Sequence, residues 1–246
     1  MKNQTYMNLQ NKKIRHEFKY ILKEKDARAI EIYLNKLGIK KDSAQEGEYP
    51  VTSLYFDTPI LEDYRDKLSG LKHRKKLRAR IHAYNFDNKN HSVWLETKEK
   101  HDMNIFKKRA MISNDEWNMF SDDLYFKVNK ISKTDNKLKR FSYLFLRKNY
   151  KPHIVVRYFR KAYVGNFISD FRVTFDSNIE ACNWVNFKYN NMVPISRGNV
   201  VLEVKFYGAM CWWFKDMVNR FNLSRSAFSK YTNSIDVLKS YNPVAR

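Results

Sequence analysis

The segment KKLRARIHAY at residues 75–84 is followed by SVWLETKEK at 92–100 and IFKKRAMI at 105–112, and together they indicate the architecture of the chain. Charged and apolar residues alternate in each segment, and the short polar segments between them suit hairpin loops. Successive side chains of a strand point to opposite faces. The three segments therefore predict antiparallel strands with one charged face and one apolar face.

Further alternating segments extend this pattern along the chain. We expect additional strands at 15–22, 51–57, 153–164, 170–176 and 199–207. Helices are expected at 26–37, near 114–122, in part of 123–149, near 214–221 and at 232–241. These eight strands, mostly linked by hairpins, predict an α+β fold. Its expected architecture is a closed eight-stranded antiparallel β-barrel with helices packed outside. We expect residues 1–246 to form a single domain, with residues 1–13 disordered.

The charge balance points to an anionic partner. The 246 residues include 47 Lys and Arg against 26 Asp and Glu, a formal net charge of +21. This excess does not separate nucleic acid, anionic lipid, polyphosphate and nucleotides. The two cysteines lack metal-ligand spacing, the polar start does not resemble a signal peptide, and no apolar run has the length of a transmembrane segment. We expect a cytoplasmic protein.

The predicted charged faces are biased to one sign. Their basic residues are Arg15, Lys19, Lys76, Arg78, Arg80, His82, Lys98, Lys100, Lys107, Arg109, Arg157, Arg172 and Lys205, and their carboxylates are Glu17, Glu96, Asp176 and Glu203. A solvent-exposed face explains any single strand of this kind. Like charges that face one another on neighbouring strands are destabilising, however. The set as a whole predicts a sheet that holds a polyanion against its basic face.

Nine segments resemble one family. RHEFKY, SLYFDT, KLRARIHAY, WLETKEK, FKKRA, VVRYFRKAYVG, FRVTFD, VLEVKF and FSKY occur in the order typical of the vacuolar transporter chaperone (VTC) domain, from about Arg15 to Tyr231. That domain is a polyphosphate polymerase of the CYTH or triphosphate tunnel metalloenzyme superfamily. The resemblance implies a basic tunnel, Mn²⁺ or Mg²⁺ as cofactor, and transfer of the ATP γ-phosphoryl group to a growing polyphosphate chain. The implied enzyme is an ATP–polyphosphate phosphotransferase of the polyphosphate kinase type.

The resemblance also implies site residues. It gives Lys19, Arg78, Arg80, Lys98, Arg157 and Lys230 as catalytic, Lys107, Arg109 and Arg172 as substrate-binding, and Glu203 as a metal ligand. The charged faces add Lys205 for the substrate and Glu17 for the metal. One departure is Arg15, which stands where the wider superfamily has the first glutamate of Glu-x-Glu-x-Lys. This loss of a possible metal ligand disfavours a hydrolase or cyclase.

Other functions stay open at the level of sequence. They are a tunnel-type triphosphate or polyphosphate hydrolase, a non-catalytic polyphosphate-binding module and a nucleic-acid-binding module. Proteins that bind single strands stack bases on aromatic residues placed among cations. The aromatic residues of the predicted strands lie mainly on the face opposite the cations. We therefore expect ATP and polyphosphate or triphosphate as partners, and no specific nucleic acid.

Overall fold

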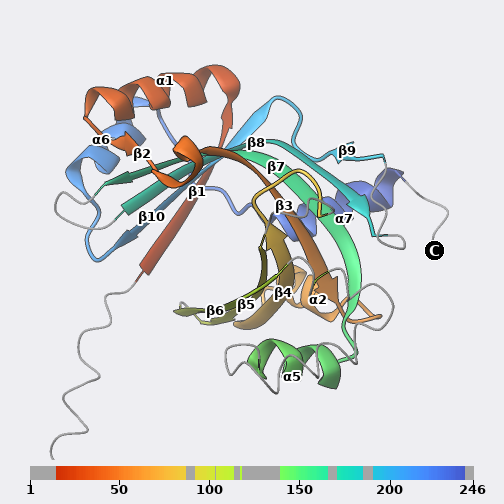
Figure 1. The fold of residues 1–246 in the computed structure, drawn as a ribbon. Coiled ribbons are helices and arrows are strands. Elements are labelled where there is room, and N and C mark those ends of the chain that lie inside the picture. The colour runs from red at the N-terminus through yellow and green to blue at the C-terminus, as the bar shows by residue number, and fades with distance from the viewer. Residues whose placement is uncertain are drawn as a thin grey trace, which may run out of the picture.

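The alternating segments form strands of one antiparallel sheet (Figure 1). This computed structural model describes residues 15–86, 92–102, 104–113, 117, 139–165, 171–184 and 191–241. Its long strands confirm the eight expected ones: β1 (Arg15–Lys23), β3 (Glu48–Asp57), β4 (His73–Ile81), β5 (Val93–His101), β6 (Asn104–Ile112), β7 (Lys151–Gly165), β8 (Phe171–Asn183) and β10 (Asn199–Tyr207). Two short strands, β2 (Lys40–Lys41) and β9 (Val193–Pro194), pair with β7 and β8.

The sheet is not closed into a barrel, so the predicted fold class is wrong on this point. Its strand order is β1-β10-β8-β7-β3-β4-β5-β6, and no backbone pairing joins β1 to β6 in the described residues. Alternation predicts how many strands form, but the last pairing depends on the curvature of the whole sheet. Both edge strands also carry exposed cations, Lys23 in β1 and Lys108 in β6. Charged side chains on edge strands oppose further pairing.

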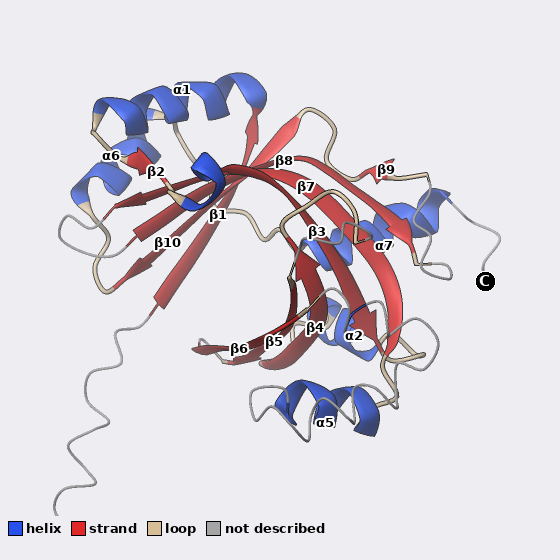
Figure 2. Cartoon of the chain, viewed as in Figure 1, coloured by secondary structure: helices blue, strands red, loops and turns tan. Residues whose placement is uncertain are grey.

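Helices cover the outer face of the curved sheet at two places (Figure 2). Near one end, α1 (Glu24–Lys36) and α6 (Trp212–Arg220) pack on β1, β10 and β8. Ile30 and Leu34 lie one helical turn apart and are fully buried there, and Gly38 ends the helix with a φ of 72°. Near the other end, α5 (Lys139–Arg147) packs on β4, β5 and β6 through Phe141 and Phe145.

The helix α7 (Lys230–Tyr241) lies on the inner face of the sheet, although all helices were expected outside. Tyr231, Ile235 and Leu238 share one buried cluster with inward residues of β3, β7 and β8. The Tyr231 ring stacks on Tyr55 of β3 at a centroid distance of 5.1 Å. Periodicity identified the apolar side of this helix, but it could not show which face of the sheet would receive it. The correction matters because α7 brings its first residue, Lys230, to the inner face.

Two helical elements were not expected, α2 (Glu62–Leu68) and the 3₁₀ helix η2 (Ala44–Gly47). The α2 sequence EDYRDKL is short and polar, so it carries little periodic signal. It is stabilised at its start by Asp57, whose carboxylate accepts hydrogen bonds from the backbone N–H of Asp63 at 3.0 Å and Tyr64 at 3.1 Å. A carboxylate at a helix N-terminus satisfies donors that have no partner within the helix.

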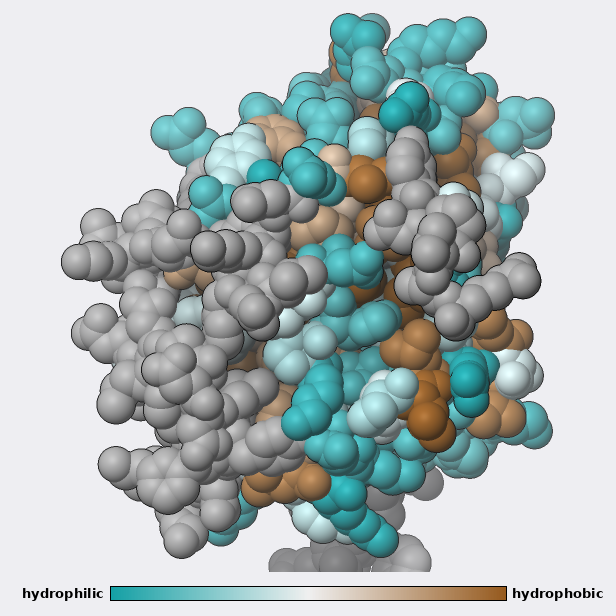
Figure 3. Space-filling view, turned by 90° about the vertical axis from the view of Figure 1, so that its right-hand side faces the viewer, coloured by the Kyte–Doolittle hydropathy of each residue, from teal (hydrophilic) through white to brown (hydrophobic). Residues whose placement is uncertain are grey.

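Other expectations fall partly outside the described residues. The N-terminal segment 1–13 and nearly all of the predicted helix at 114–122 lie there, whereas α5 confirms helix within 123–149. Among the residues that the structure describes, no helix combines the length and the apolar character needed to span a lipid bilayer. On the face turned to the viewer in Figure 3, hydrophilic side chains surround separate apolar areas.

Candidate functional site

The charged faces of strands from both ends of the sheet meet on its inner side, here called the basic inner face. Lys98 of β5 forms an ion pair with Glu17 of β1, with Nζ and Oε2 3.3 Å apart. Lys76 of β4 donates to the Oγ of Ser229, just before α7, at 2.8 Å. Side chains that are remote in sheet order therefore reach one another. The curvature of the sheet places most of the predicted site residues on the same side.

On β1 and β10, two carboxylates share one ammonium group. Lys19 Nζ lies 3.1 Å from Glu17 and 3.4 Å from Glu203, and Glu203 also pairs with Lys205. Burial and Glu203 oppose ionisation of Glu17, but Lys98 and Lys19 outweigh them and lower its pKa to about 2. Burial likewise opposes ionisation of Glu203, and Lys205 and Lys19 still hold its pKa well below the usual range. Both carboxylates are therefore anionic at neutral pH.

On β4, β5 and β6, Glu96 is the shared partner. Arg78 Nε lies 2.6 Å from Glu96 Oε2, and Lys107 of β6 pairs with the other oxygen. Arg80 is nearly buried and donates to Ser53 Oγ at 3.0 Å, but forms no ion pair with any carboxylate in the described part of the chain. Arg109 lies on the exposed side of this group, 4.7 Å above the Trp94 ring. Arg80 thus has hydrogen-bonding capacity left for an anionic ligand.

On β7 and β8, the fully buried Asp176 binds two cations. Arg160 makes a bidentate contact with its carboxylate at 2.7 and 2.8 Å, and Lys230 approaches within 2.5 Å. Burial opposes ionisation of Asp176, but Arg160 and Lys230 lower its pKa far below the usual range. Arg160 was not among the predicted site residues. The available signal was the segment VVRYFRKA, whose two arginines are three residues apart and so fall on opposite faces.

The structure does not bring Arg157 to the basic inner face. Arg157 is opposite Thr52 in the register of β7 and β3, whereas Arg160 is opposite Tyr49, which belongs to the inner cluster. The Arg157 guanidinium instead lies 3.3 Å from Glu180. Arg172 does join the inner side at its margin, where it binds Asp42 at 2.7 Å and the Tyr49 hydroxyl at 3.1 Å.

Lys76 was placed on the predicted charged face but not among the site residues. It forms no ion pair with a described carboxylate, and its Nζ lies 5.4 Å from the centroid of the Tyr231 ring. Burial, followed by the charges of Lys19 and Lys98, lowers the pKa of Lys76 to about 7. An ammonium group in these surroundings is stabilised by any anion that binds beside it.

A few aromatic rings also lie on the basic inner face, although most aromatic residues of the strands pack on the opposite face, as the sequence predicts. The Arg78 guanidinium lies 6.0 Å from the Tyr55 ring, and Lys230 Nζ lies 4.5 Å from the Tyr158 ring. Tyrosines on this face belong to the apolar cluster under α7. Their rings attract positive charge, so the cations are held against the edge of this core cluster.

Glu17 and Glu203, the two carboxylates that the sequence analysis assigned to a divalent metal, lie together beside Lys19. Within the described ranges, no group of three or more His, Cys, Asp or Glu residues has the arrangement of a metal site. Mg²⁺ is commonly held by one or two carboxylates together with the phosphates of a substrate. Two ionised carboxylates that already share a cation at Lys19 fit that pattern, with phosphate oxygens as the remaining ligands.

Comparison with solved structures finds similar ones at low sequence identity. The PH1819 protein from Pyrococcus horikoshii OT3 is 10% identical, covers 91% of this chain and 99% of its own, and gives a TM-score of 0.50. A "putative adenylate cyclase" from Bacillus halodurans is 12% identical, covers 88% of this chain and 93% of its own, and gives a TM-score of 0.49. No curated protein matches the chain.

The family model described as the VTC domain matches residues 14–239. This range contains every strand and helix of the sheet fold except the last two residues of α7. It confirms the resemblance drawn from the nine ordered segments. The chain belongs to the VTC domain family.

Proposed function

We propose that this VTC domain is a polyphosphate polymerase, which transfers the γ-phosphoryl group of ATP to the end of a polyphosphate chain held on the basic inner face. The observation that carries the proposal is the direct opposition of like charges, Lys76 to Lys98 and Lys98 to Lys107, on neighbouring strands. Such pairs are destabilising by themselves. An extended polyanion between the strands offsets their repulsion.

The cations differ in what they do to phosphate. Arg80 and Arg78 present planar guanidinium groups that hold two phosphate oxygens at once, whereas Lys19, Lys98 and Lys230 act as point charges. Phosphoryl transfer needs little covalent chemistry from the protein, so positioning and stabilisation of charge account for the rate. The attacking phosphate oxygen is already anionic at neutral pH, and no general base is required.

A divalent ion, Mg²⁺ or Mn²⁺, would be held by Glu203 and Glu17 and would offset charge on the transferred phosphoryl group. Lys19 contacts both carboxylates and keeps them close to each other. Lys205 holds the second oxygen of Glu203, so that the carboxylate is fixed from two sides. These contacts orient the carboxylates before substrate arrives.

The proposal predicts that the purified protein, incubated with ATP and Mn²⁺, forms polyphosphate visible as a ladder on a gel, with release of ADP. Glu203→Gln should raise the metal concentration for half-maximal activity by about 10- to 100-fold, the usual effect of disturbing a metal site. Glu180→Gln is the matched control, because Glu180 pairs with Arg157 on the other face. Inorganic phosphate without polymer would contradict the polymerase and favour a hydrolase. Unchanged metal dependence of Glu203→Gln would make Glu203 an ion-pair partner only.

Tripolyphosphate binding is expected to weaken as pH rises above about 7, where Lys76 loses its proton in the free protein. A bound anion raises the pKa of Lys76, so binding takes up a proton between the free and bound pKa values. Below about 7, Lys76 is charged in both states and adds no pH dependence. Calorimetry near pH 8, in buffers of different ionisation enthalpy, measures the uptake. Lys76→Arg should reduce the proton uptake, because arginine stays charged. Equal proton uptake by the variant and the wild type would contradict the assignment of the proton to Lys76.

A further inference from the structure

Two histidines face each other where β4 begins and β5 ends, outside the basic inner face. His73 is the first residue of β4 and is directly opposite His101, the last residue of β5. The backbone N–H of Asp102 donates to the carbonyl of Lys72 at 3.1 Å. The two histidines therefore form a non-hydrogen-bonded pair of the ladder, the kind in which opposite side chains are closest. They share the outer face of the sheet with Glu99, because side chains two residues apart in a strand point the same way.

The facing ring nitrogens have the spacing of two ligands on one metal ion. His73 Nδ1 and His101 Nδ1 are 2.9 Å apart, and both side chains are exposed. Metal–nitrogen bonds of about 2.0–2.1 Å place two ligating nitrogens about 2.9 Å apart at a right angle and about 3.3 Å apart at the tetrahedral angle. The last torsion of a histidine side chain is broad, so exposed rings can turn to direct both nitrogens at an ion.

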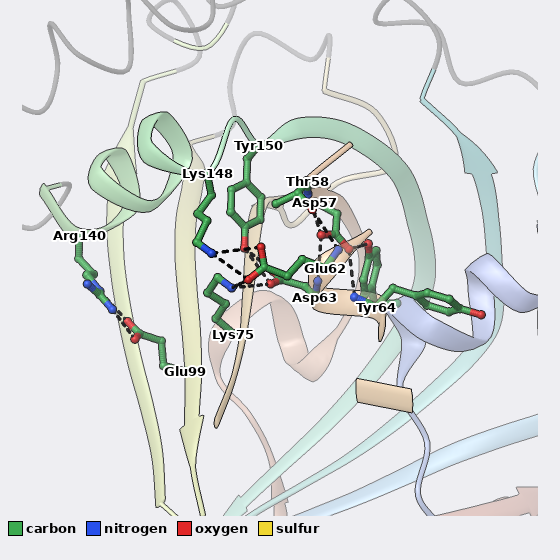
Figure 4. Close-up of polar contacts among 11 residues, drawn as sticks. Asp57, Thr58, Glu62, Asp63, Tyr64, Lys75, Glu99, Arg140, Lys148 and Tyr150 are labelled. Carbon is green, nitrogen blue, oxygen red and sulfur yellow. Dashed lines mark hydrogen bonds and ion pairs between the residues drawn. The ribbon is translucent and has the colours of Figure 1, made fainter. Parts of the chain in front are cut away.

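A carboxylate lies beside the other ring nitrogen of His101. Glu99 Oε2 is 3.8 Å from His101 Nε2. Arg140 of α5 holds Glu99 at 2.9 and 2.7 Å (Figure 4), and these hydrogen bonds lower the pKa of Glu99. Anionic Glu99 favours a proton on Nε2 of His101, which leaves Nδ1 as the nitrogen with a free lone pair. Metal-binding histidines commonly have such a carboxylate at the second nitrogen, where it fixes the tautomer and makes the ligand more basic.

We propose that His73 and His101 form a binding site for a divalent transition-metal ion such as Zn²⁺ or Ni²⁺, separate from the proposed catalytic site and independent of its activity. Imidazole nitrogen suits these ions, whereas Mg²⁺ prefers oxygen ligands. No group of three or more metal-ligating residues occurs within the described ranges, so water completes the coordination. The ion links the start of β4 to the end of β5. It stabilises the folded chain, because the unfolded chain does not hold the two rings together.

The test is a calorimetric titration of the full chain, carrying no histidine tag, with Zn²⁺. Glu99→Gln should weaken Zn²⁺ binding by about 10- to 100-fold, the usual effect of removing the carboxylate behind a histidine ligand. His73→Asn and His101→Asn should each weaken it by at least as much, because each removes a ligand. Since both rings hold one ion, the double variant should bind about as weakly as either single variant. Zn²⁺ should also raise the Tm of the wild type and leave the Tm of the histidine variants unchanged.

The matched control is His16→Asn, which removes an imidazole from β1, remote from β4 and β5 in the strand order. It should leave the affinity for Zn²⁺ unchanged. A wild type that binds no Zn²⁺, or binds it no better than His73→Asn does, would overturn the site and leave the two histidines with a hydrogen bond only. The same loss in His16→Asn would also overturn it. Displacement of Zn²⁺ by an excess of Mg²⁺ would assign the ion to oxygen ligands instead and contradict the proposal.

Discussion

Arg78→Gln/Arg80→Gln is expected to lower the affinity for tripolyphosphate by roughly two to four orders of magnitude. Hydrogen bonds to charged groups contribute about 1.5–3 kcal/mol each, and every 1.4 kcal/mol is tenfold in affinity. Glutamine keeps a polar side chain at both positions and places no second carboxylate beside Glu96. Lys107 continues to neutralise Glu96 after the change. Titration calorimetry with tripolyphosphate measures the loss.

The matched control for these arginines is Arg140→Gln. Arg140 binds Glu99 on the outer side of β5 and contacts none of the inner cations. Replacing Arg140 should leave the affinity for tripolyphosphate unchanged. Tripolyphosphate binding by the double variant within threefold of wild type, in a protein with an unchanged thermal transition, would contradict the assigned role. Duplex DNA that binds the double variant as tightly as wild type, and more tightly than tripolyphosphate, would favour the nucleic-acid function.

Asp176→Asn is expected to cost about 3–5 kcal/mol in the free energy of unfolding, because it leaves two buried cations without their carboxylate. Arg160 and Lys230 both depend on it. The folded-state pKa of Asp176 is depressed, so its contribution is complete above the unfolded pKa of about 4 and is lost as pH falls. The difference between variant and wild type should therefore be largest at neutral pH and shrink in acid. Urea unfolding at several pH values measures it.

Glu180→Gln provides the comparison for Asp176 within the same strand. Its pair with Arg157 is partly exposed, and exposed ion pairs contribute about 0–1 kcal/mol. A variant of Asp176 that loses no more stability than Glu180→Gln would show that the buried triad is not a source of stability. In that case Asp176 would matter only for placing Arg160 and Lys230.

The strands and their charged faces could be predicted because both follow from a period of two. The segment 75–84 is an example, since alternate residues Lys76, Arg78 and Arg80 do lie on one face. The sequence pattern does not show as clearly which of the two faces of a strand turns inward. In β7 both Arg157 and Arg160 directly follow an apolar residue. A register shift of the β7–β8 pair between Arg157 and Phe159 also changes which β8 residues lie opposite the strand. The resemblance selected Arg157, and the structure places Arg160 inside.

The remaining differences between prediction and structure arise from contacts between residues that are far apart in the sequence. Ile235 and Leu238 identify an apolar helix side in α7, but the partner for that side is formed by β3, β7 and β8, which are far away in sequence. Lys76 resembled its charged neighbours in the sequence. Its lack of a carboxylate partner depends on where Glu17 and Glu96 point after folding, which no local pattern records.

The unpaired edges of the sheet affect how the proposed polyphosphate substrate could reach the basic inner face. In a closed barrel, a long polyphosphate chain could enter only by one of its ends. A cyclic polyphosphate, or one with blocked ends, could not enter at all. Here, in the described part of the chain, β1 and β5 are linked across the opening by the side chains of Glu17 and Lys98 rather than by a backbone ladder. Parting a salt bridge disturbs no strand pairing. Sideways loading of a long chain, at any point along its length, is therefore compatible with an intact fold, and ring-shaped polyphosphates become useful ligands for detecting it.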